Sequence, residues 1–265
     1  MMNDLSASWR KRPSQPGSAG GDWVDVLRLA GGRLAVSMGD AAGHDGQAAA
    51  LALLLSRLLR DRLQLGTDPG QALAGALAEI ADLGDMGEMY ATAFVAIAEA
   101  DGTVTYANAG HPAPVVLNGE PSREADGPAP GRLLGPTGPL LSDLFAGTTI
   151  WSNRTLRLGP GESLLLYTDG LAEARNAAGA EFGLARLVTA GSRRNAGRGR
   201  TDGADVLDRL FTEVATFTRR AADDRSALVL SRPDDDGGDS RARGRSRGAA
   251  ISAGVRASAG SALAG

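Results

Sequence analysis

The stretch "RLAVSMGDAAGHDGQAAALALLLSRLL", Arg33 to Leu59, joins a strand pattern to a helix pattern through a short acidic corner. Apolar residues alternate with small ones from Leu34 to Met38, as in a half-buried strand. From Gln47 to Leu63, Ala and Leu dominate without Gly or Pro, which predicts a helix. Asp40 lies at the corner between the two. A carboxylate there has two interpretations: it caps the helix, or it holds a metal ion.

The composition limits the chemistry that the chain can perform. Its 265 residues are 43% hydrophobic, enough for one large domain or two small ones, and the net charge of -3 gives no bias towards nucleic acid or anionic membranes. The absence of cysteine excludes thiolate metal sites and thiol nucleophiles. Since His44 and His111 are the only histidines, a metal site must rely mainly on oxygen ligands, which suit Mg²⁺ or Mn²⁺.

No apolar run is long enough to span a membrane, and the N-terminus has no apolar signal core. We therefore expect a cytoplasmic protein that does not insert into membranes.

Around the acidic corner, strand and helix patterns alternate along the chain. The opening stretch completes a predicted hairpin with its turn at Gly31-Gly32, and Asp68-Pro69 has the N-cap and first-turn signals of a second helix. Residues 1–21 and 119–147 are polar or rich in Gly and Pro, so irregular structure is predicted for both. The remaining predicted elements are strands within 90–120, 149–170 and 226–232, and helices at about 184–190 and 204–220.

The sequence changes character after residue 232. Residues 233–265 are rich in Gly, Ser, Ala and Arg with hardly any large apolar side chain, which predicts a disordered tail following one folded domain over residues 1–232. The arginines of the tail could contact nucleic acid. A solvated, charged tail is the favoured interpretation, because most Arg-rich tails are charged linkers.

Four acidic sites share one local setting, a strand end or edge beside glycine or other small residues: Asp22, Asp40, Asp169 and the pair Asp223–Asp224. Taken singly, each also fits a turn, a helix cap or a loop. Two carboxylates about 4 Å apart repel by roughly 4 kcal/mol at an effective dielectric constant near 20. If the four sites meet in space, hard divalent cations are needed to keep them ionised.

The order of several motifs resembles a known family. These motifs are "GGDWVDVLRL", "GRLAVSMGDAAGHDGQAAAL", "YATAFVAI", "VTYANAGHPAPVVL", "LGPGESLLLYTDGLAEARNAAGAEFG" and "ADDRSALVL". Together they resemble bacterial metal-dependent protein phosphatases of the type 2C class, in the branch named after the sporulation stage II E phosphatase. The resemblance covers nearly all of residues 6–232. It implies an α+β fold, a four-layer α-β-β-α sandwich of two antiparallel sheets flanked by helices, and makes residues 1–232 the phosphatase domain.

The resemblance also implies a site with two Mg²⁺ or Mn²⁺ ions. Asp40 resembles the carboxylate that bridges both ions, and Asp22 resembles the ligand of one ion beside the Ala41 carbonyl. Asp169 and Asp223 resemble the ligands of the other ion, with Asp224 as a neighbour. In the family, a metal-bridging water attacks the phosphorus of phosphoserine or phosphothreonine in line.

The sequence departs from the wider class at the proton donor. Eukaryotic type 2C enzymes carry a histidine two residues after the bridging aspartate, and this chain has Ala42 there. His44 follows two residues later; it could assist through a water or cap the next helix, and the structural role is favoured. Asp45, where the family usually has glycine, either caps the helix start or perturbs the site by adding negative charge. His111, in "NAGHPAP", is expected to order a turn. The basic residues 10–12 are further candidates for phosphate contact.

Two functions of different classes remain. The first is a protein serine/threonine phosphatase whose substrate, by family analogy, is an anti-sigma-factor antagonist. Residues 45–83 would then couple a separate regulator or self-association to the metal site. The second is a catalytically inactive module that keeps the fold for binding. The presence of all the metal-site carboxylates favours the enzyme.

Overall fold

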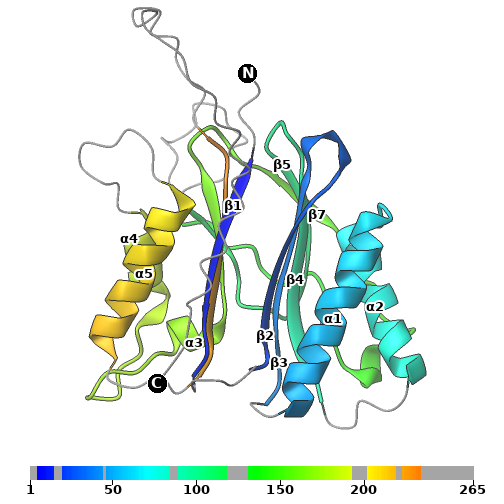
Figure 1. Cartoon of the computed structure of the whole chain (residues 1–265), viewed down its shortest axis with the longest axis horizontal. Helices are drawn as coiled ribbons and strands as arrows, with labels where there is room; N and C mark the ends of the chain where they lie inside the picture. Colours follow the sequence, from blue (N-terminus) through cyan, green and yellow to red (C-terminus); the bar gives the residue numbers. More distant parts are fainter. Residues whose placement is uncertain are drawn as a thin grey trace, which may run out of the picture.

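The computed structural model describes residues 5–14, 20–43, 46–83, 89–117, 131–192, 202–218 and 223–233. Two antiparallel sheets pack face to face, and helices cover their outer faces (Figure 1). One sheet has the strand order β1-β9-β8-β6 and the other β2-β3-β4-β5-β7. The expected α+β sandwich is thus confirmed. The strands are β1 Ser6–Arg12, β2 Asp22–Arg28, β3 Leu34–Ala41, β4 Ala91–Ala98, β5 Thr103–Ala109, β6 Val115–Leu117, β7 Arg154–Arg157, β8 Ser163–Tyr167 and β9 Arg225–Ser231.

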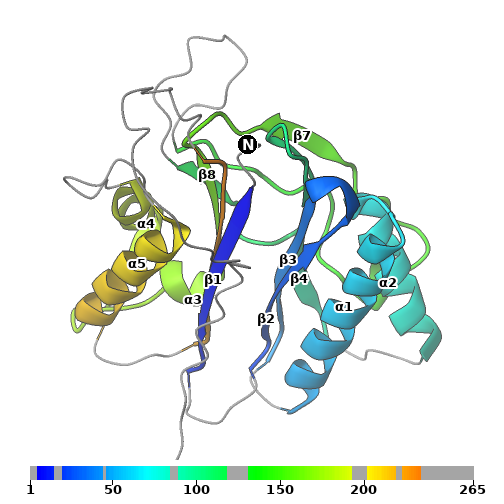
Figure 2. The same ribbon diagram turned by 45° about the horizontal axis from the view of Figure 1, so that its top comes forward.

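Two pairs of helices form the outer layers, one pair on each sheet (Figure 2). Helices α1 (Gly46–Gln64) and α2 (Pro69–Leu83) cover the five-stranded sheet, and α4 (Gly183–Ser192) and α5 (Gly203–Phe217) cover the four-stranded sheet. A single short helix turn, α3 (Asp169–Ala172), follows β8 directly. Within the described ranges, none of the helices is both long and apolar enough to cross a membrane.

The β2–β3 hairpin shows how the sequence pattern aims the acidic corner. Successive side chains of a strand point to opposite faces. Leu34, Val36 and Met38 belong to the core between the two sheets, whereas Ala35 and Ala41 belong to the core beneath α1 and α2. By this alternation Asp40 points between the sheets.

The helix signals are confirmed as well. Asp68 caps α2, because its Oδ1 accepts a hydrogen bond from the Gln71 backbone N–H at 2.9 Å. Arg60 of α1 donates from Nε to Asp25 Oδ2 of β2 at 2.8 Å, which ties the helix to the sheet. Helix α1 begins at Gly46, six residues after Asp40, so Asp40 lies in β3 and does not cap the helix.

The prediction of irregular structure for residues 1–21 was wrong for Ser6–Arg12, which form the edge strand β1. This segment, "SASWRKR", has only Ala7 and Trp9 to pack against the intersheet core. Its outer face carries Arg10 and Arg12, whose guanidinium groups lie over the ring of Phe211 in α5. Pairing with β9 and this aromatic contact stabilise a strand that alternating hydrophobicity alone does not reveal.

Two further expectations meet the limits of the described residues. The predicted loop at 119–147 is irregular where it is described, apart from the short turn Asp143–Phe145. Residues 234–265, which make up nearly all of the predicted tail, lie outside the described residues.

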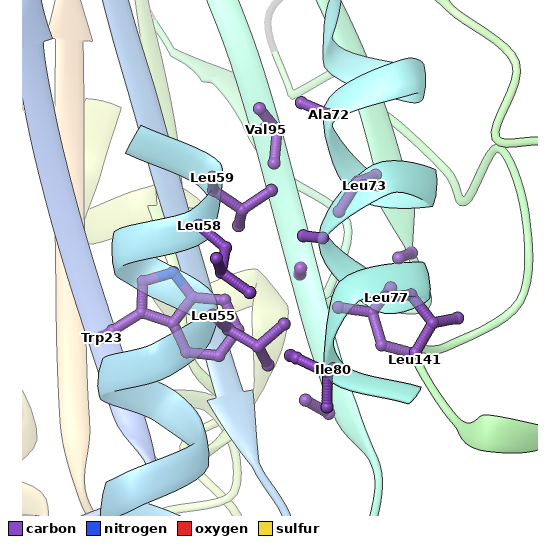
Figure 3. Packing of buried hydrophobic residues seen from close by; sticks show 14 of the residues in the cluster. Trp23, Leu55, Leu58, Leu59, Ala72, Leu73, Leu77, Ile80, Val95 and Leu141 are labelled. Atoms are coloured by element: carbon purple, nitrogen blue, oxygen red, sulfur yellow. The ribbon is translucent and has the colours of Figure 1, made fainter. Parts of the chain in front are cut away.

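The core beneath α1 and α2 allows a direct test of the packing. Leu55 of α1 is fully buried in a cluster with Leu59, Leu73 and Leu77 (Figure 3). We expect Leu55→Ala to lower the unfolding free energy by about 2–5 kcal/mol, because it leaves a cavity in a close-packed layer. Urea denaturation measures this loss. Leu53 on the same helix is 74% exposed, so Leu53→Ala should change stability little, and equal losses in both variants would contradict this packing.

Candidate metal centre

The acidic residues lie at strand ends that meet at one end of the sandwich. Asp22 begins β2 and pairs in register with Asp40 near the end of β3. Asp169 begins α3 directly after β8, and Asp223 and Asp224 directly precede β9. Because β8 and β9 are neighbours in the opposite sheet, these segments face the β2–β3 hairpin across the intersheet space, at the end where α1 begins (Figure 1).

Asp22 is fixed by hydrogen bonds from the opposite sheet. Its Oδ2 accepts a hydrogen bond from Ser226 Oγ at 2.6 Å and another from Thr168 Oγ1 at 3.0 Å. The Ser226 backbone N–H donates to Thr168 Oγ1, also at 3.0 Å, so the Thr168 hydroxyl is itself held by β9. Lys11 Nζ donates to the Asp22 backbone carbonyl at 2.6 Å. The carboxylate is therefore positioned before any ligand binds.

Two consecutive glycines let the chain pass close to these carboxylates. A Cβ on Gly21 would lie 2.2 Å from the Ala41 carbonyl oxygen and 2.7 Å from Asp40 Oδ1. A Cβ on Gly20, whose φ is +61°, would lie 1.5 Å from Asp224 Oδ2. No larger residue fits at either position without displacing the site. The glycines of "GGDW" thus serve close approach rather than turn formation.

The electrostatics of the group are unfavourable to negative charge. Burial, and after it the neighbouring charges of Asp22, Asp169, Asp223 and Asp224, raise the pKa of Asp40 to about 8. The four other carboxylates therefore lie within electrostatic range of Asp40.

Asp22 and Asp169 carry related shifts. Burial raises the pKa of Asp22 to about 7, although the hydrogen bonds from Ser226 and Thr168 act in the opposite direction. Burial, and then the Asp223 charge, raise the pKa of Asp169. Neighbouring carboxyl groups with raised pKa values are typical of a functional site such as one that binds a cation.

Asp224 supplies a more specific sign of a missing partner. Its Oδ1 accepts a hydrogen bond from the Ser14 backbone N–H at 2.7 Å, but its Oδ2 is buried and has no hydrogen-bond partner among the described residues. Its own backbone N–H donates to Asp223 Oδ1 at 2.7 Å. A buried, unpaired carboxylate oxygen is costly and fits an arriving cation or its water.

The side chains do not form a ready-made cage. Within the described ranges, no three His, Cys, Asp or Glu side chains are gathered closely enough to hold an ion as they stand. Mutual repulsion between carboxylates favours this separation when no cation is present. The donor set still fits a hard divalent ion, because it consists of carboxylate oxygens with the Ala41 carbonyl beside them.

The structure thus brings together the residues singled out in the sequence, namely Asp22, Asp40, Ala41, Asp169, Asp223 and Asp224. It also adds Thr168 and Ser226, which the sequence reasoning missed. Both continue the inward-facing alternation of their strands, since Leu166 and Leu228 belong to the intersheet core. This alternation is the sequence signal that could have identified Thr168 and Ser226 as inward-facing residues.

Of the two histidines, His111 is described, and it contributes no ligand to the group. His44 and Asp45 lie outside the described residues. His111 is buried, its Nδ1 lies 3.0 Å from Thr92 Oγ1, and its backbone is held by hydrogen bonds with Asn108. Burial lowers its pKa to about 3, so it stays neutral. These contacts support the structural role expected for His111.

The sequence of the chain matches known proteins. The family model "Stage II sporulation protein E (SpoIIE)" matches residues 30–233. Protein IcfG of Synechocystis sp. is 34% identical over 106 residues, which cover 40% of this chain and 15% of IcfG. The chain therefore corresponds to a small part of that relative.

Solved structures share the fold. The RsbU and RsbW domains of Rv1364c from Mycobacterium tuberculosis match with a TM-score of 0.66 at 24% identity, over 88% of this chain and 61% of that one. The PP2C phosphatase domain of SpoIIE from Bacillus subtilis, solved with a fragment of its regulatory domain, matches with a TM-score of 0.67 at 16% identity, over 85% and 62%. At these identities the likeness establishes the fold.

Proposed function

The chain belongs to the stage II sporulation protein E family, and from this premise we propose that it is a divalent-metal-dependent protein serine/threonine phosphatase. One observation carries the proposal. Five carboxylates meet at one end of the sandwich, and Asp40, which interacts with the other four, has a pKa raised to about 8. Hydrolysis of a phosphomonoester needs concentrated positive charge at the phosphate, and this group is suited to recruit it.

The positions of the residues support the following proposed metal ligands. Asp40 is the proposed shared ligand, because it experiences the charges of both Asp22 and the Asp169–Asp223 pair. Asp22 and the Ala41 carbonyl would complete one side, and Asp169 and Asp223 the other. When bound there, two Mg²⁺ or Mn²⁺ ions would neutralise the carboxylates, orient the phosphate and lower the pKa of a water so that it can attack phosphorus in line.

The protein's own residues prepare the site. Thr168 and Ser226 hold the Asp22 carboxylate at Oδ2, so its orientation does not depend on the ion. His111 cannot protonate the leaving oxygen, since it is buried and neutral. Ala42 has no ionisable group. The leaving seryl or threonyl oxygen is therefore expected to take its proton from solvent water or from residues outside the described ranges.

The proposed substrate is a phosphorylated regulatory protein, and by family analogy an anti-sigma-factor antagonist. Similarity to a structure with RsbU and RsbW domains supports a place in a comparable regulatory system. We also propose that residues 45–83 receive the regulatory signal, through a separate partner or self-association. Helix α1 begins next to the acidic corner and packs on β2 and β3, which carry Asp22 and Asp40.

Hydrolysis of p-nitrophenyl phosphate and of a phosphoserine peptide tests the activity. The purified chain should hydrolyse both with Mn²⁺ and neither with excess EDTA. We expect Asp169→Asn to lower kcat/KM by at least about 100-fold, since it removes a proposed metal ligand. Asp82→Asn is the matched control, because Asp82 is an exposed residue of α2.

The outcomes separate the enzyme from an inactive binding module. Wild-type protein that hydrolyses neither substrate with Mg²⁺, Mn²⁺ or another divalent ion would be an inactive module of the same fold. For the regulatory segment, the Leu55→Ala variant gives the readout. If its activity falls only in proportion to its folded fraction, α1 packing has no regulatory role.

A further inference from the structure

A pair of arginines lies on the outer face of the four-stranded sheet, beside the candidate metal centre. Arg12, the last residue of β1, and Arg225, the first residue of β9, are register partners. Arg225 follows Asp223 by two residues, which corresponds to about 7 Å along an extended strand. Ala227 and Val229 continue the Arg225 side of β9 into the core beneath α5, so this face is opposite to the one that carries Ser226.

Within the described ranges, no carboxylate pairs with the guanidinium group of Arg12 or of Arg225. Arg10, two residues before Arg12, pairs with Asp208 of α5. Neither Arg12 nor Arg225 forms an ion pair or a side-chain hydrogen bond with any described residue, and Arg225 Nε is buried without a partner. The only polar or aromatic contact of the Arg12 guanidinium among these residues is the Phe211 ring, 5.7 Å away.

This arrangement is unfavourable without a ligand. Arg12 and Arg225 are register partners on neighbouring strands, so their positive charges lie close together. Like charges side by side, one with a buried unpaired N–H, cost free energy unless an anion joins them. Guanidinium groups offer forked donors that match the geometry of a carboxylate or phosphate.

We propose that Arg12 and Arg225 form an anion-binding subsite that takes an acidic side chain of the phosphoprotein substrate, near the phosphorylated residue. The inference rests on the proposed phosphatase function and specifies its substrate class. Extended peptide advances about 3.3 Å per residue, so an acidic residue two or three positions from the phosphoserine matches the spacing between Asp223 and Arg225.

The surrounding charge favours an acidic peptide over nucleic acid. A polyanionic backbone crossing the Arg12–Arg225 pair would also pass the five carboxylates of the metal centre, and the protein has a net charge of -3. A single carboxylate needs to satisfy only the arginine pair. Free inorganic phosphate has the same chemistry as a ligand, and the experiment must distinguish it from a peptide group.

Binding to metal-free protein in EDTA tests the subsite without catalysis. The probes are fluorescent peptides with serine at the reaction position and either two glutamates or two glutamines at positions two and three residues away. Wild type should bind the glutamate peptide about tenfold more tightly than the glutamine peptide. The double variant Arg12→Gln/Arg225→Gln should bind both equally.

Arg10→Gln is the matched control, because Arg10 contacts the same Phe211 ring but is already paired with Asp208. It should keep the tenfold preference. The double variant Arg12→Lys/Arg225→Lys keeps the charge but loses the fork and should retain part of the preference. Circular dichroism melting checks that each variant is folded.

Several results would overturn the subsite. One is an undiminished preference in the Gln double variant, and another is an equal loss in Arg10→Gln. A third is loss of the preference at inorganic phosphate concentrations too low to occupy a weak peptide site. A fourth is tighter binding of a single-stranded oligonucleotide of equal charge.

Kinetics give a separate test of the subsite. The Gln double variant should raise KM for the acidic phosphopeptide about tenfold more than it raises KM for the matching glutamine phosphopeptide. If wild type hydrolyses no phosphomonoester, the phosphatase proposal fails while the binding result still decides the subsite.

Discussion

Asp40→Asn should reduce phosphatase activity by at least about 100-fold while making the metal-free protein more stable. Asp40 experiences the charges of all four other carboxylates and burial besides, which together raise its pKa to about 8. The neutral amide removes the proposed shared ligand, so metal binding and turnover are lost. The same change removes a buried group whose ionised form is disfavoured, so the unfolding free energy of the metal-free protein increases.

Three measurements on the same variant check this opposition. Mn²⁺-dependent hydrolysis gives the loss, and thermal unfolding in EDTA at pH 8 gives the gain, with about 2–4 °C expected for each kcal/mol of repulsion removed in a domain of this size. Saturating Mn²⁺ should raise the melting temperature of wild type and leave that of Asp40→Asn nearly unchanged. Asp82→Asn should behave as wild type in all three. A variant that loses both activity and apo stability would indicate a purely structural role for Asp40.

The second large effect is a pH dependence that reverses when metal is added. The pKa values of Asp22 and Asp40 rise on folding from 3.8 to about 7 and about 8. In that interval the folded protein binds more protons than the unfolded chain, so the unfolding free energy decreases as the pH rises. The stabilisation of the folded state by these two groups is fully present below about pH 4 and is lost as the pH rises through about 8.

Subtracting the profile of the Asp22→Asn/Asp40→Asn double variant isolates these groups from all others. Urea denaturation in EDTA from pH 5 to 9 gives the unfolding free energy of both proteins. The value for wild type minus the value for the double variant should decrease as the pH increases. With saturating Mn²⁺ the slope should change sign, because metal and protons compete for the same oxygens. A flat difference in EDTA would mean that the carboxylates ionise independently of folding, contrary to the geometry.

The sequence pattern predicted the parts of the fold where local signals and burial agree. Alternation from Leu34 to Met38 predicts the strand and also the face on which Asp40 lies, because the period of two continues to the corner. The N-cap signal of Asp68 marks the start of α2 because the capping hydrogen bond is local. The resemblance supplied what local patterns cannot, namely that segments far apart in the chain meet.

The features that were missed depend on contacts between distant segments. Strand β1 has few apolar residues and is stabilised by pairing with β9 and by stacking on Phe211. Thr168 directly follows β8 and Ser226 lies in β9, and only the assembled sandwich brings their hydroxyls to Asp22. Arg12 and Arg225 are separated by more than two hundred residues in the sequence, so their pairing and missing counter-charge become visible only in the sheet register.

The central claim is that the carboxylates at the end of the sandwich form a divalent-metal site. Crystals of the wild-type chain soaked in Mn²⁺ and measured at the manganese absorption edge test it most directly. We predict two anomalous-difference peaks among Asp22, Asp40, Asp169 and Asp223, with a carboxylate oxygen of Asp40 near both, and no such pair of peaks in Asp40→Asn. Well-ordered carboxylates without an anomalous peak at saturating Mn²⁺, or peaks that persist in Asp40→Asn, would contradict the claim.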